Sequence, residues 1–265
     1  MKKLVFLFLF LFLASAIVTS QSIKILPVRI DSVEINADKF IGTDGFKNYY
    51  YSKNNLLFKK NAEAVLQYQE LSLGTITKVD IQNPLKIILF YEQFNTVVIL
   101  DKQLNEVQRI EFSKLENSIV ASAIGIAGQN KLWIFNSLKQ QLGLYDLVTA
   151  QYREIGTNIR EVFNYYQTNY NYFQWISINK QWNACDLYGK IYTIAKVDSF
   201  EECQIIDENK LLFLKDNTLF LRDYKLDKQY EIKIVEKSFL KFYYKDQILS
   251  IFTNQGITNY KLTLP

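Results

Sequence analysis

The chain has 265 residues, of which 49% are hydrophobic and 22% charged, with 31 lysines and arginines against 27 aspartates and glutamates. This near-neutral mixture gives no reason to expect nucleic acid, because such binding depends on clustered lysine and arginine. The sequence contains no histidine. Its absence removes the commonest metal ligand and the commonest general base near neutral pH, so a Ser-His-Asp triad is excluded.

The first twenty residues have the order of a secretory signal peptide. Two lysines precede an unbroken apolar run at residues 4–13, and small residues follow. Cleavage after Ala16 and cleavage after Ser20 both fit. The rival interpretation is an uncleaved anchor, but the apolar stretch as far as Val18 is about 15 residues long, shorter than the roughly 20 that a spanning helix needs. We predict a signal peptide over residues 1–20 and a single domain over residues 21–265.

Short apolar or β-favouring stretches then recur with a period near 40 residues. In chain order, the strongest predicted strands are residues 49–51, 87–91, 132–135, 172–176, 211–214 and 248–252. A turn rich in Asn, Asp or Gln follows each one, and further strands are predicted after these turns at residues 56–58, 96–100, 142–145, 183–188, 218–221 and 257–260. Asn and Asp tolerate the left-handed conformations that hairpin turns require, so this chain can reverse direction often with only nine glycines.

Four aspartates occupy the same place in this repeat. Asp101, Asp146, Asp186 and Asp223 lie 45, 40 and 37 residues apart, each at the end of a predicted strand. An acidic residue at such a position accepts backbone N–H groups of the next turn, so we predict that these aspartates stabilise turns and are not catalytic.

A period of this length, with several strands in each unit, is typical of β-propeller blades. Six units are present, and we predict an all-β, six-bladed β-propeller. The sixth unit has no fourth strand before Pro265. The strand-like residues 24–35 are expected to supply it, which would close the ring and hide two sheet edges.

Cys185 and Cys203 fall in predicted strands that are not neighbours. An exported protein could form a disulfide, but this placement favours two buried thiols. No glycine-rich phosphate loop, zinc spacing or calcium loop is present, so the sequence predicts no metal site and no cofactor.

Five residues are candidates for binding a partner or ligand. Arg160 and Glu161 lie in one connection between units, and Glu201 and Glu202 lie in the next. In many propellers such connections surround one mouth of the central channel, although solvated loop charge is the alternative. Glu201 and Glu202 are adjacent on a strand and point to opposite faces, so they cannot easily share a substrate. Tyr170, in a turn of the aromatic-rich fourth unit, is the ring most expected to be exposed; most others are expected in the core.

The repeat resembles the superfamily of secreted bacterial β-propellers, with its quinoprotein-like and NHL-like members, over nearly all of residues 21–265. The chain departs from the enzymes of that group. The NHL-type enzymes rely on histidine and metal, and Trp133, Trp175 and Trp182 lack the regular spacing of quinoprotein-like docking motifs. Residues 86–110 (KIILFYEQFNTVVILDKQLNEVQRI) look most like small periplasmic propellers, some of which attach to outer-membrane machinery such as the type IX secretion translocon.

These observations lead to two functional hypotheses. The first is a non-catalytic, exported propeller, expected in the periplasm and peripheral to the outer membrane, that binds another cell-envelope protein. It predicts neither nucleic acid nor a membrane span after signal cleavage. The alternative is a propeller that binds or hydrolyses a glycan or peptide with carboxylates at the channel mouth. An exposed apolar patch on one rim would favour the first hypothesis, and a deep polar channel with converging acids would favour the second.

Overall fold

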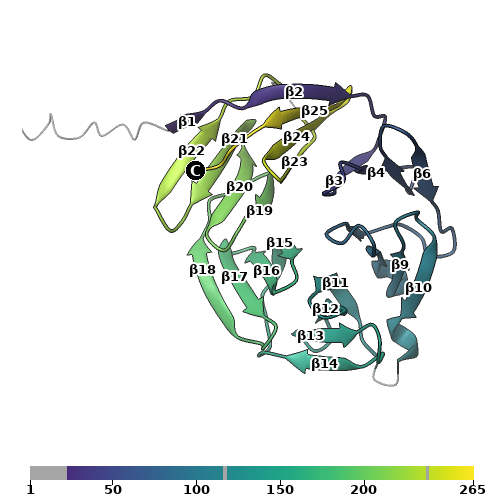
Figure 1. Cartoon of the computed structure of the whole chain (residues 1–265). Helices are drawn as coiled ribbons and strands as arrows, with labels where there is room; N and C mark the ends of the chain where they lie inside the picture. The colour runs from purple at the N-terminus through teal and green to yellow at the C-terminus, as the bar shows by residue number, and fades with distance from the viewer. Residues whose placement is uncertain (1–22, 116–117, 237–238) are drawn as a thin grey trace, which may run out of the picture.

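The computed structural model describes residues 23–115, 118–236 and 239–265, so the predicted signal peptide at residues 1–20 lies outside the described residues. The described chain is almost entirely β-structure, with two short 3-10 helices, η2 (Glu92–Phe94) and η3 (Phe112–Lys114). Six sheets stand around a common axis, as Figure 1 shows. The predicted all-β, six-bladed β-propeller is confirmed.

Each blade has four antiparallel strands from the axis to the rim, in chain order except for the outer strand of blade 6, and blade 5 carries a fifth, parallel strand. Blade 1 contains β3 (Lys39–Thr43), β4 (Tyr49–Lys53), β5 (Leu56–Lys60) and β6 (Val65–Tyr68). Blade 2 contains β7 (Lys78–Asp80), β8 (Ile87–Tyr91), β9 (Thr96–Leu100) and β10 (Glu106–Glu111). Blade 3 contains β11 (Ala121–Ala127), β12 (Lys131–Asn136), β13 (Gln141–Asp146) and β14 (Tyr152–Ile155). Blade 4 contains β15 (Phe163–Thr168), β16 (Tyr172–Ser177), β17 (Gln181–Asp186) and β18 (Ile191–Lys196). Blade 5 contains β19 (Glu202–Ile205), β20 (Lys210–Lys215), β21 (Thr218–Asp223) and β22 (Lys228–Ile232). Blade 6 contains β23 (Lys241–Lys245), β24 (Ile248–Thr253), β25 (Gly256–Lys261) and, outermost, β2 (Val28–Val33).

The N-terminal segment closes the ring, as predicted, but it does so in two pieces. β2 pairs antiparallel with β25 and becomes the outer strand of blade 6. β1 (Ile23–Ile25) pairs in parallel with β22 and adds a fifth strand to blade 5. The sequence predicted one strand over residues 24–35; the strand is interrupted at Pro27, which has no N–H to donate to a ladder. One short segment therefore joins two consecutive blades.

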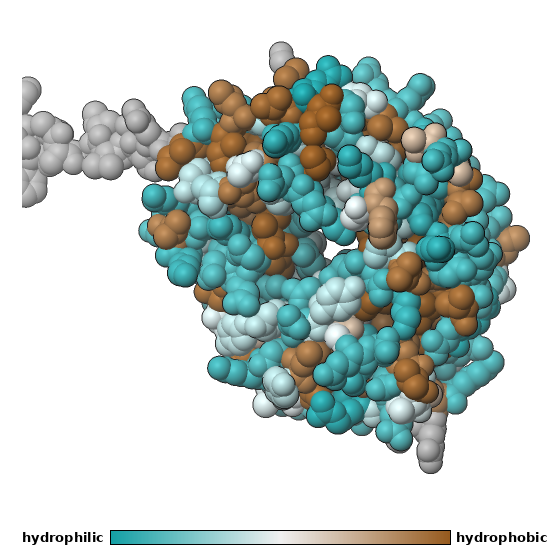
Figure 2. All heavy atoms as spheres, viewed as in Figure 1, coloured by the Kyte–Doolittle hydropathy of each residue, from teal (hydrophilic) through white to brown (hydrophobic). Residues whose placement is uncertain are grey.

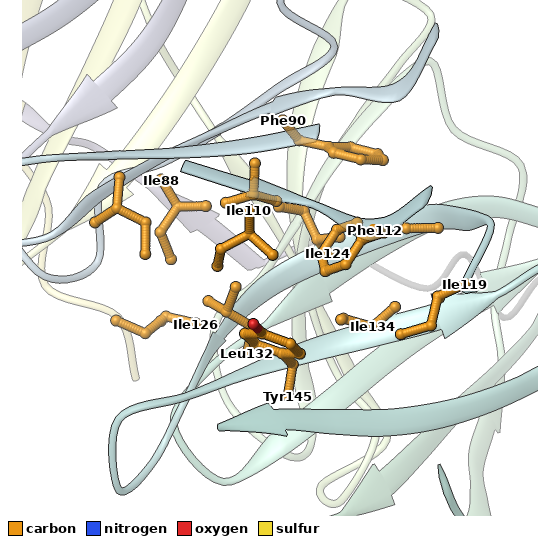
Figure 3. Close-up of a cluster of buried hydrophobic side chains, with 13 residues drawn as sticks. Ile88, Phe90, Ile110, Phe112, Ile119, Ile124, Ile126, Leu132, Ile134 and Tyr145 are labelled. Atoms are coloured by element: carbon orange, nitrogen blue, oxygen red, sulfur yellow. The ribbon is translucent and has the colours of Figure 1, made fainter. Parts of the chain in front are cut away.

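The core is divided into six clusters, one at each interface between neighbouring blades. Figure 3 shows the cluster between blades 2 and 3, where Ile88 and Phe90 face Ile126 and Ile134. Because the middle strands of a blade are covered on both faces, β8 and β9 are buried at every position. This explains why their sequences are continuously apolar and do not alternate.

The turns have the geometry that their composition predicted. Positive φ values occur in the turns between second and third strands, for example 49° at Asn54, 49° at Asn95 and 57° at Asn217. The repeated aspartates stabilise the next turns: Asp186 Oδ1 accepts the N–H groups of Tyr188 and Lys190, both at 2.9 Å. The other three make the same kind of bond, at Asp101, Asp146 and Asp223. The predicted turn role is confirmed.

The inner strands of neighbouring blades are joined by side chains. Gln167 in β15 donates from Nε2 to the carbonyl oxygen of Ile205 in β19 at 2.8 Å, and its Oε1 accepts the N–H of Ile205 at 3.0 Å. At the equivalent position of blade 3 stands Gly125, where an added Cβ would lie 1.9 Å from Thr168 Oγ1 of blade 4. Gln167 and Gly125 thus occupy equivalent positions of their inner strands, and each lies against the inner strand of the next blade.

Candidate functional site

The direction of the strands decides which loops lie at each end of the disc. Every inner strand begins at one end of the disc and finishes at the other. The end at which the inner strands begin carries the connections between blades and the turns between second and third strands, and we call it the connection face. The opposite end carries the turns between first and second strands and between third and fourth strands, and we call it the hairpin face.

On the connection face, asparagine side chains hold the connections in place. Asn55 donates from Nδ2 to the carbonyl oxygen of Gly74 at 2.7 Å, and its Oδ1 accepts the N–H of Ile76 at 2.8 Å. Asn95 binds the next connection in the same way, by a bond to each end of residues 119–121. These bonds fix the loops before any partner arrives, which reduces the entropy that binding would cost.

Large apolar side chains are exposed at the turn tips of three adjacent blades. Phe94, Leu138 and Ile178 occupy the turns between the second and third strands of blades 2, 3 and 4. The equivalent turns of blades 5, 6 and 1 are residues 216–217, 254–255 and 54–55, all of them Asp, Asn or Gln. Half of the ring is therefore apolar at its turn tips and the other half is polar.

Three more exposed apolar residues lie beside these tips. The carbonyl oxygen of Val120 accepts the N–H of Ser137 at 2.8 Å, and that of Val162 accepts the N–H of Ile178 at 3.0 Å. Leu71 lies in the connection between blades 1 and 2, and Gly74 of that connection lies next to the Phe94 ring. We call this set the apolar arc; its members are Leu71, Phe94, Val120, Leu138, Val162 and Ile178. Leu71 is 80% exposed and Leu138 71%, and apolar surface gathered in this way marks sites of interaction.

A channel runs between the inner strands, and Figure 2 shows the face of the disc hollowed near its centre. Residues at one level of this channel come from successive blades, because they pair with equivalent positions of the second strands. They are Lys39, Lys78, Ala123, Tyr165, Glu202 and Lys241. The level thus combines three ammonium groups, one carboxylate and one phenol.

Lys78 reaches across the channel. Its Nζ lies 4.6 Å from the centroid of the Tyr166 ring, although Lys78 belongs to blade 2 and Tyr166 to blade 4. The alanines and glycine of β11 leave the space for this contact. Burial lowers the pKa of Lys78, as does the nearby Lys241, while the charges of Asp80 and Glu202 raise it. The carboxylate of Asp80 is already engaged, because its oxygens accept bonds from Gln82, Ile126 and Thr168.

The predicted site residues do not form one site. Arg160, Glu161 and Glu201 lie in connections on the connection face. Glu161 Oε2 accepts bonds from Trp175 Nε1 at 3.0 Å and Asn183 Nδ2 at 3.2 Å, so this carboxylate stabilises blade 4. Glu201 Oε1 accepts the N–H of Asp216 at 2.9 Å and has a comparable role in blade 5.

Glu202 and Tyr170 are placed elsewhere. Glu202 begins β19 and stands at the channel level of Lys78, apart from the side chain of Glu201. Tyr170 lies between β15 and β16 on the hairpin face, and it is 42% exposed, as expected. Cys185 and Cys203 are free and buried, which confirms the thiol interpretation.

Sequence reasoning missed Lys78 and the apolar arc. A signal for the arc was available, because Phe94, Leu138 and Ile178 interrupt turns that are otherwise polar. Lys78 gave no such signal, since its neighbours Tyr166, Glu202 and Lys241 are far away in the chain. Within residues 23–115, 118–236 and 239–265, no group of acidic or cysteine side chains is arranged to hold a metal ion. None of the helices there is long and apolar enough to cross a membrane.

The radial blades, the channel and the closed ring define this chain as a six-bladed β-propeller. No protein-family model matches its sequence, and no curated protein matches it either. Solved structures share the fold. Virginiamycin B lyase from Staphylococcus aureus is 11% identical with a TM-score of 0.56, over 85% of this chain and 80% of that one. A catalytically inactive histidine-to-alanine variant of that enzyme, with quinupristin, is 10% identical with a TM-score of 0.55. The match covers 88% of this chain and 99% of that one.

YCF48 bound to D1 peptide is 9% identical with a TM-score of 0.56, over 93% of this chain and 95% of that chain. The resemblance to bacterial β-propellers is thereby confirmed for the fold. At such identities the similarity says nothing more, because one propeller scaffold carries unrelated functions.

Proposed function

We propose that this protein is a non-catalytic propeller of the cell envelope that binds another protein through the apolar arc. The observation that carries the proposal is the asymmetry of the turn tips on the connection face: Phe94, Leu138 and Ile178 are exposed where the equivalent turns of the other three blades are polar. Packing alone does not require this difference, because these side chains lie on the surface. An apolar surface of a protein partner would remove them from water.

Two further facts agree with a binding role. The loops beneath the arc are fixed by Asn55 and Asn95, so the surface is preorganised. YCF48, which shares the fold, holds a peptide in its solved structure. The apolar N-terminal run expected to direct export supports a partner in the envelope, in the periplasm at the outer membrane.

The catalytic alternative finds less support. Hydrolysis of a glycan by carboxylates needs a facing pair of acids. The two carboxylates whose charges act on Lys78 are Asp80 and Glu202, and Asp80 is occupied by hydrogen bonds from its own blade and from the next two. The chain also lacks histidine, whereas the related lyase loses its activity when a histidine is replaced by alanine.

Site-specific photocrosslinking in cells tests the proposal. A photoreactive phenylalanine analogue at position 138 or 178 is expected to trap one discrete protein partner, while the same analogue at position 217 or 254, in the equivalent polar turns of blades 5 and 6, traps none. A Leu138→Asp, Ile178→Asp double variant should abolish copurification of that partner and leave the fold intact by circular dichroism. Equal crosslinking from both halves of the face, or recovery of a lone monomer after gentle solubilisation, would refute the proposal.

A further inference from the structure

Apolar side chains are exposed along the part of the outer rim that the N-terminal segment forms. We call residues 23–33, which comprise β1, β2 and the two residues between them, the strap. Four large apolar side chains of the strap are exposed within eight consecutive residues: Ile23, Leu26, Val28 and Ile30, with Leu26 at 76% and Val28 at 66%. Figure 2 shows apolar atoms along this part of the rim, beside the start of β1.

The outer strands of blades 1–4 do not share this feature. β6 and β10 each expose one large apolar side chain, Val65 and Val107, and β14 and β18 expose none. Each of these four strands also contains at least two partly or fully buried residues, whereas β2 is exposed at its first five positions. A position on the rim therefore does not account for the apolar strap, and such a patch marks a surface that meets an apolar phase or partner.

The charges among these exposed apolar residues are positive. Lys24 and Arg29 are exposed, and residues 23–30 contain no acid. Arg29 donates to the hydroxyl oxygen of Ser32 at 2.8 Å, which is a neutral partner. Lys261, in the neighbouring strand β25, is exposed as well. Long basic side chains keep their charge in water or in a headgroup layer while their stems cover apolar surface.

The acids beside these basic residues are engaged elsewhere. Asp31 Oδ1 accepts a hydrogen bond from Asn259 Nδ2 at 2.6 Å. Glu231, opposite Lys24 in the ladder, pairs with Lys233. The basic side chains of the strap are therefore in excess at this surface, and anionic lipid headgroups attract such charge.

The sequence places the strap directly after the apolar N-terminal run. The apolar stretch ends at Val18, five residues before Ile23. Because an extended chain covers at most about 3.5 Å per residue, the start of the strap cannot lie more than about 18 Å from a membrane that holds this stretch. The precursor thus presents the strap to a lipid surface before any cleavage.

We propose that the strap binds the lipid surface of a membrane, with its apolar side chains at the headgroup boundary and Lys24 and Arg29 against anionic headgroups. Exposed apolar area combined with basic charge gives reversible binding of this kind, without a spanning segment. The strap lies on blades 5 and 6, across the ring from the middle of the apolar arc, so a membrane and a protein partner can be bound together. The proposal does not rest on that partner.

Cosedimentation with lipid vesicles tests the proposal. The chain from Gln21 retains every described residue and lacks the apolar run, so that run cannot itself cause binding. Vesicles of phosphatidylethanolamine and phosphatidylglycerol should carry this protein into the pellet, and vesicles of phosphatidylcholine alone should bind it more weakly. Raising the salt concentration should weaken the binding to the anionic vesicles, because salt screens exposed charges.

Matched variants separate the strap from the apolar arc. Leu26→Ser, Val28→Ser should weaken binding to the anionic vesicles roughly tenfold or more, because two apolar side chains no longer enter the interface. Leu138→Ser, Ile178→Ser, at similarly exposed positions of the arc, should leave vesicle binding unchanged. Both double variants change surface residues, so both should keep the melting temperature of the wild type.

A charge variant and the oligomeric state complete the test. Lys24→Gln, Arg29→Gln should weaken binding to the anionic vesicles by roughly tenfold to thirtyfold and leave binding to phosphatidylcholine unchanged. Failure of the wild type to bind anionic vesicles, or equal binding by the strap and arc variants, would overturn the proposal. A dimer in solution that Leu26→Ser, Val28→Ser converts to a monomer would show a second copy on the strap and would overturn it as well.

Discussion

Gln204 binds the backbone of Tyr244 at two atoms. Its Nε2 donates to the carbonyl oxygen of Tyr244 at 2.7 Å, and its Oε1 accepts the N–H of Tyr244 at 2.8 Å. Gln204 lies in the inner strand of blade 5 and Tyr244 in that of blade 6. Gln167 makes the same pair of bonds one blade earlier. The inner strands of neighbouring blades belong to different sheets and do not hydrogen-bond to each other through their backbones. The long amide side chains of Gln204 and Gln167 make the connection instead.

Replacing Gln204 by alanine should lower the free energy of unfolding by about 1–3 kcal/mol, because the N–H and C=O of Tyr244 lose their partners. Urea denaturation measures the change. Gln103→Ala, in an exposed turn, is the matched control and should leave stability nearly unchanged. A Gln204→Ala protein as stable as the control would show that water satisfies Tyr244 equally well.

Gly125→Ala should destabilise the propeller by about 1–3 kcal/mol through overpacking, because the new Cβ would lie 1.9 Å from Thr168 Oγ1. Gly45→Ala is the control, since nothing lies within 4 Å of its added Cβ. Its effect should stay within about 0.5 kcal/mol. Differential scanning calorimetry of both variants checks this expectation. If the two glycines tolerate alanine equally, blades 3 and 4 are packed less tightly than described.

Removal of β1 and β2 should open the ring. A chain that begins at Ile23 keeps both strands, whereas one that begins at Glu34 loses them and exposes the edges of β22 and β25. The core cluster between blades 6 and 1 is small, with Ile35 and Phe40 on one side and Phe252 and Ile257 on the other. We expect the shorter chain to unfold at lower urea concentration and to self-associate through its free edges. Light scattering after size exclusion would reveal a stable monomer if closure were dispensable.

Lowering the pH should remove the contribution of Glu70 to the free energy of unfolding. Its carboxylate accepts the N–H and the hydroxyl of Ser72, both at 2.8 Å, and pairs with Arg109. The backbone bond from Ser72, followed by the bond from Arg109, lowers the pKa of Glu70 from 4.5 to about 2. A depressed pKa in the folded state means that the stabilisation is present above pH 4.5 and is lost as the pH falls toward 2.

The stability difference between wild type and Glu70→Gln should therefore be full at pH 6 and vanish near pH 2. Urea unfolding at several pH values measures it, with Glu63→Gln as the control for loss of an exposed carboxylate. A difference that stays constant from pH 6 to pH 2 would contradict the assigned bonds of Glu70.

Both thiols should resist alkylation in the native protein. Burial raises the pKa of Cys185 to about 12 and raises that of Cys203 as well, so neither forms the reactive thiolate near neutral pH. Iodoacetamide at pH 8 is expected to modify them only in denaturant, as followed by mass spectrometry. Rapid native labelling of Cys203 would show that blades 4 and 5 separate readily.

Sequence alone determined the repeat, the blade count and the closure of the ring. These features depend on local chemistry that recurs every 40 residues: continuously apolar middle strands, Asn-rich turns and aspartates such as Asp146 and Asp186 that fix the next turn. The inner strand of blade 1 was not predicted, and neither was the pairing of β1 with blade 5 as a separate strand. β3 is short and β1 has only three residues. Both strands are stabilised by pairing with neighbouring strands, and their own sequences do not indicate those partners.

Only the tertiary structure decided where charge and apolar surface gather. Closing a ring brings Lys78, Glu202 and Lys241 from blades 2, 5 and 6 to one level of the channel, although more than a hundred residues separate the first from the others. Glu161 and Glu201, by contrast, accept hydrogen bonds within blades 4 and 5. The repeated blades follow from local sequence. The residues that line the central channel come together only through contacts between blades that are distant in the sequence.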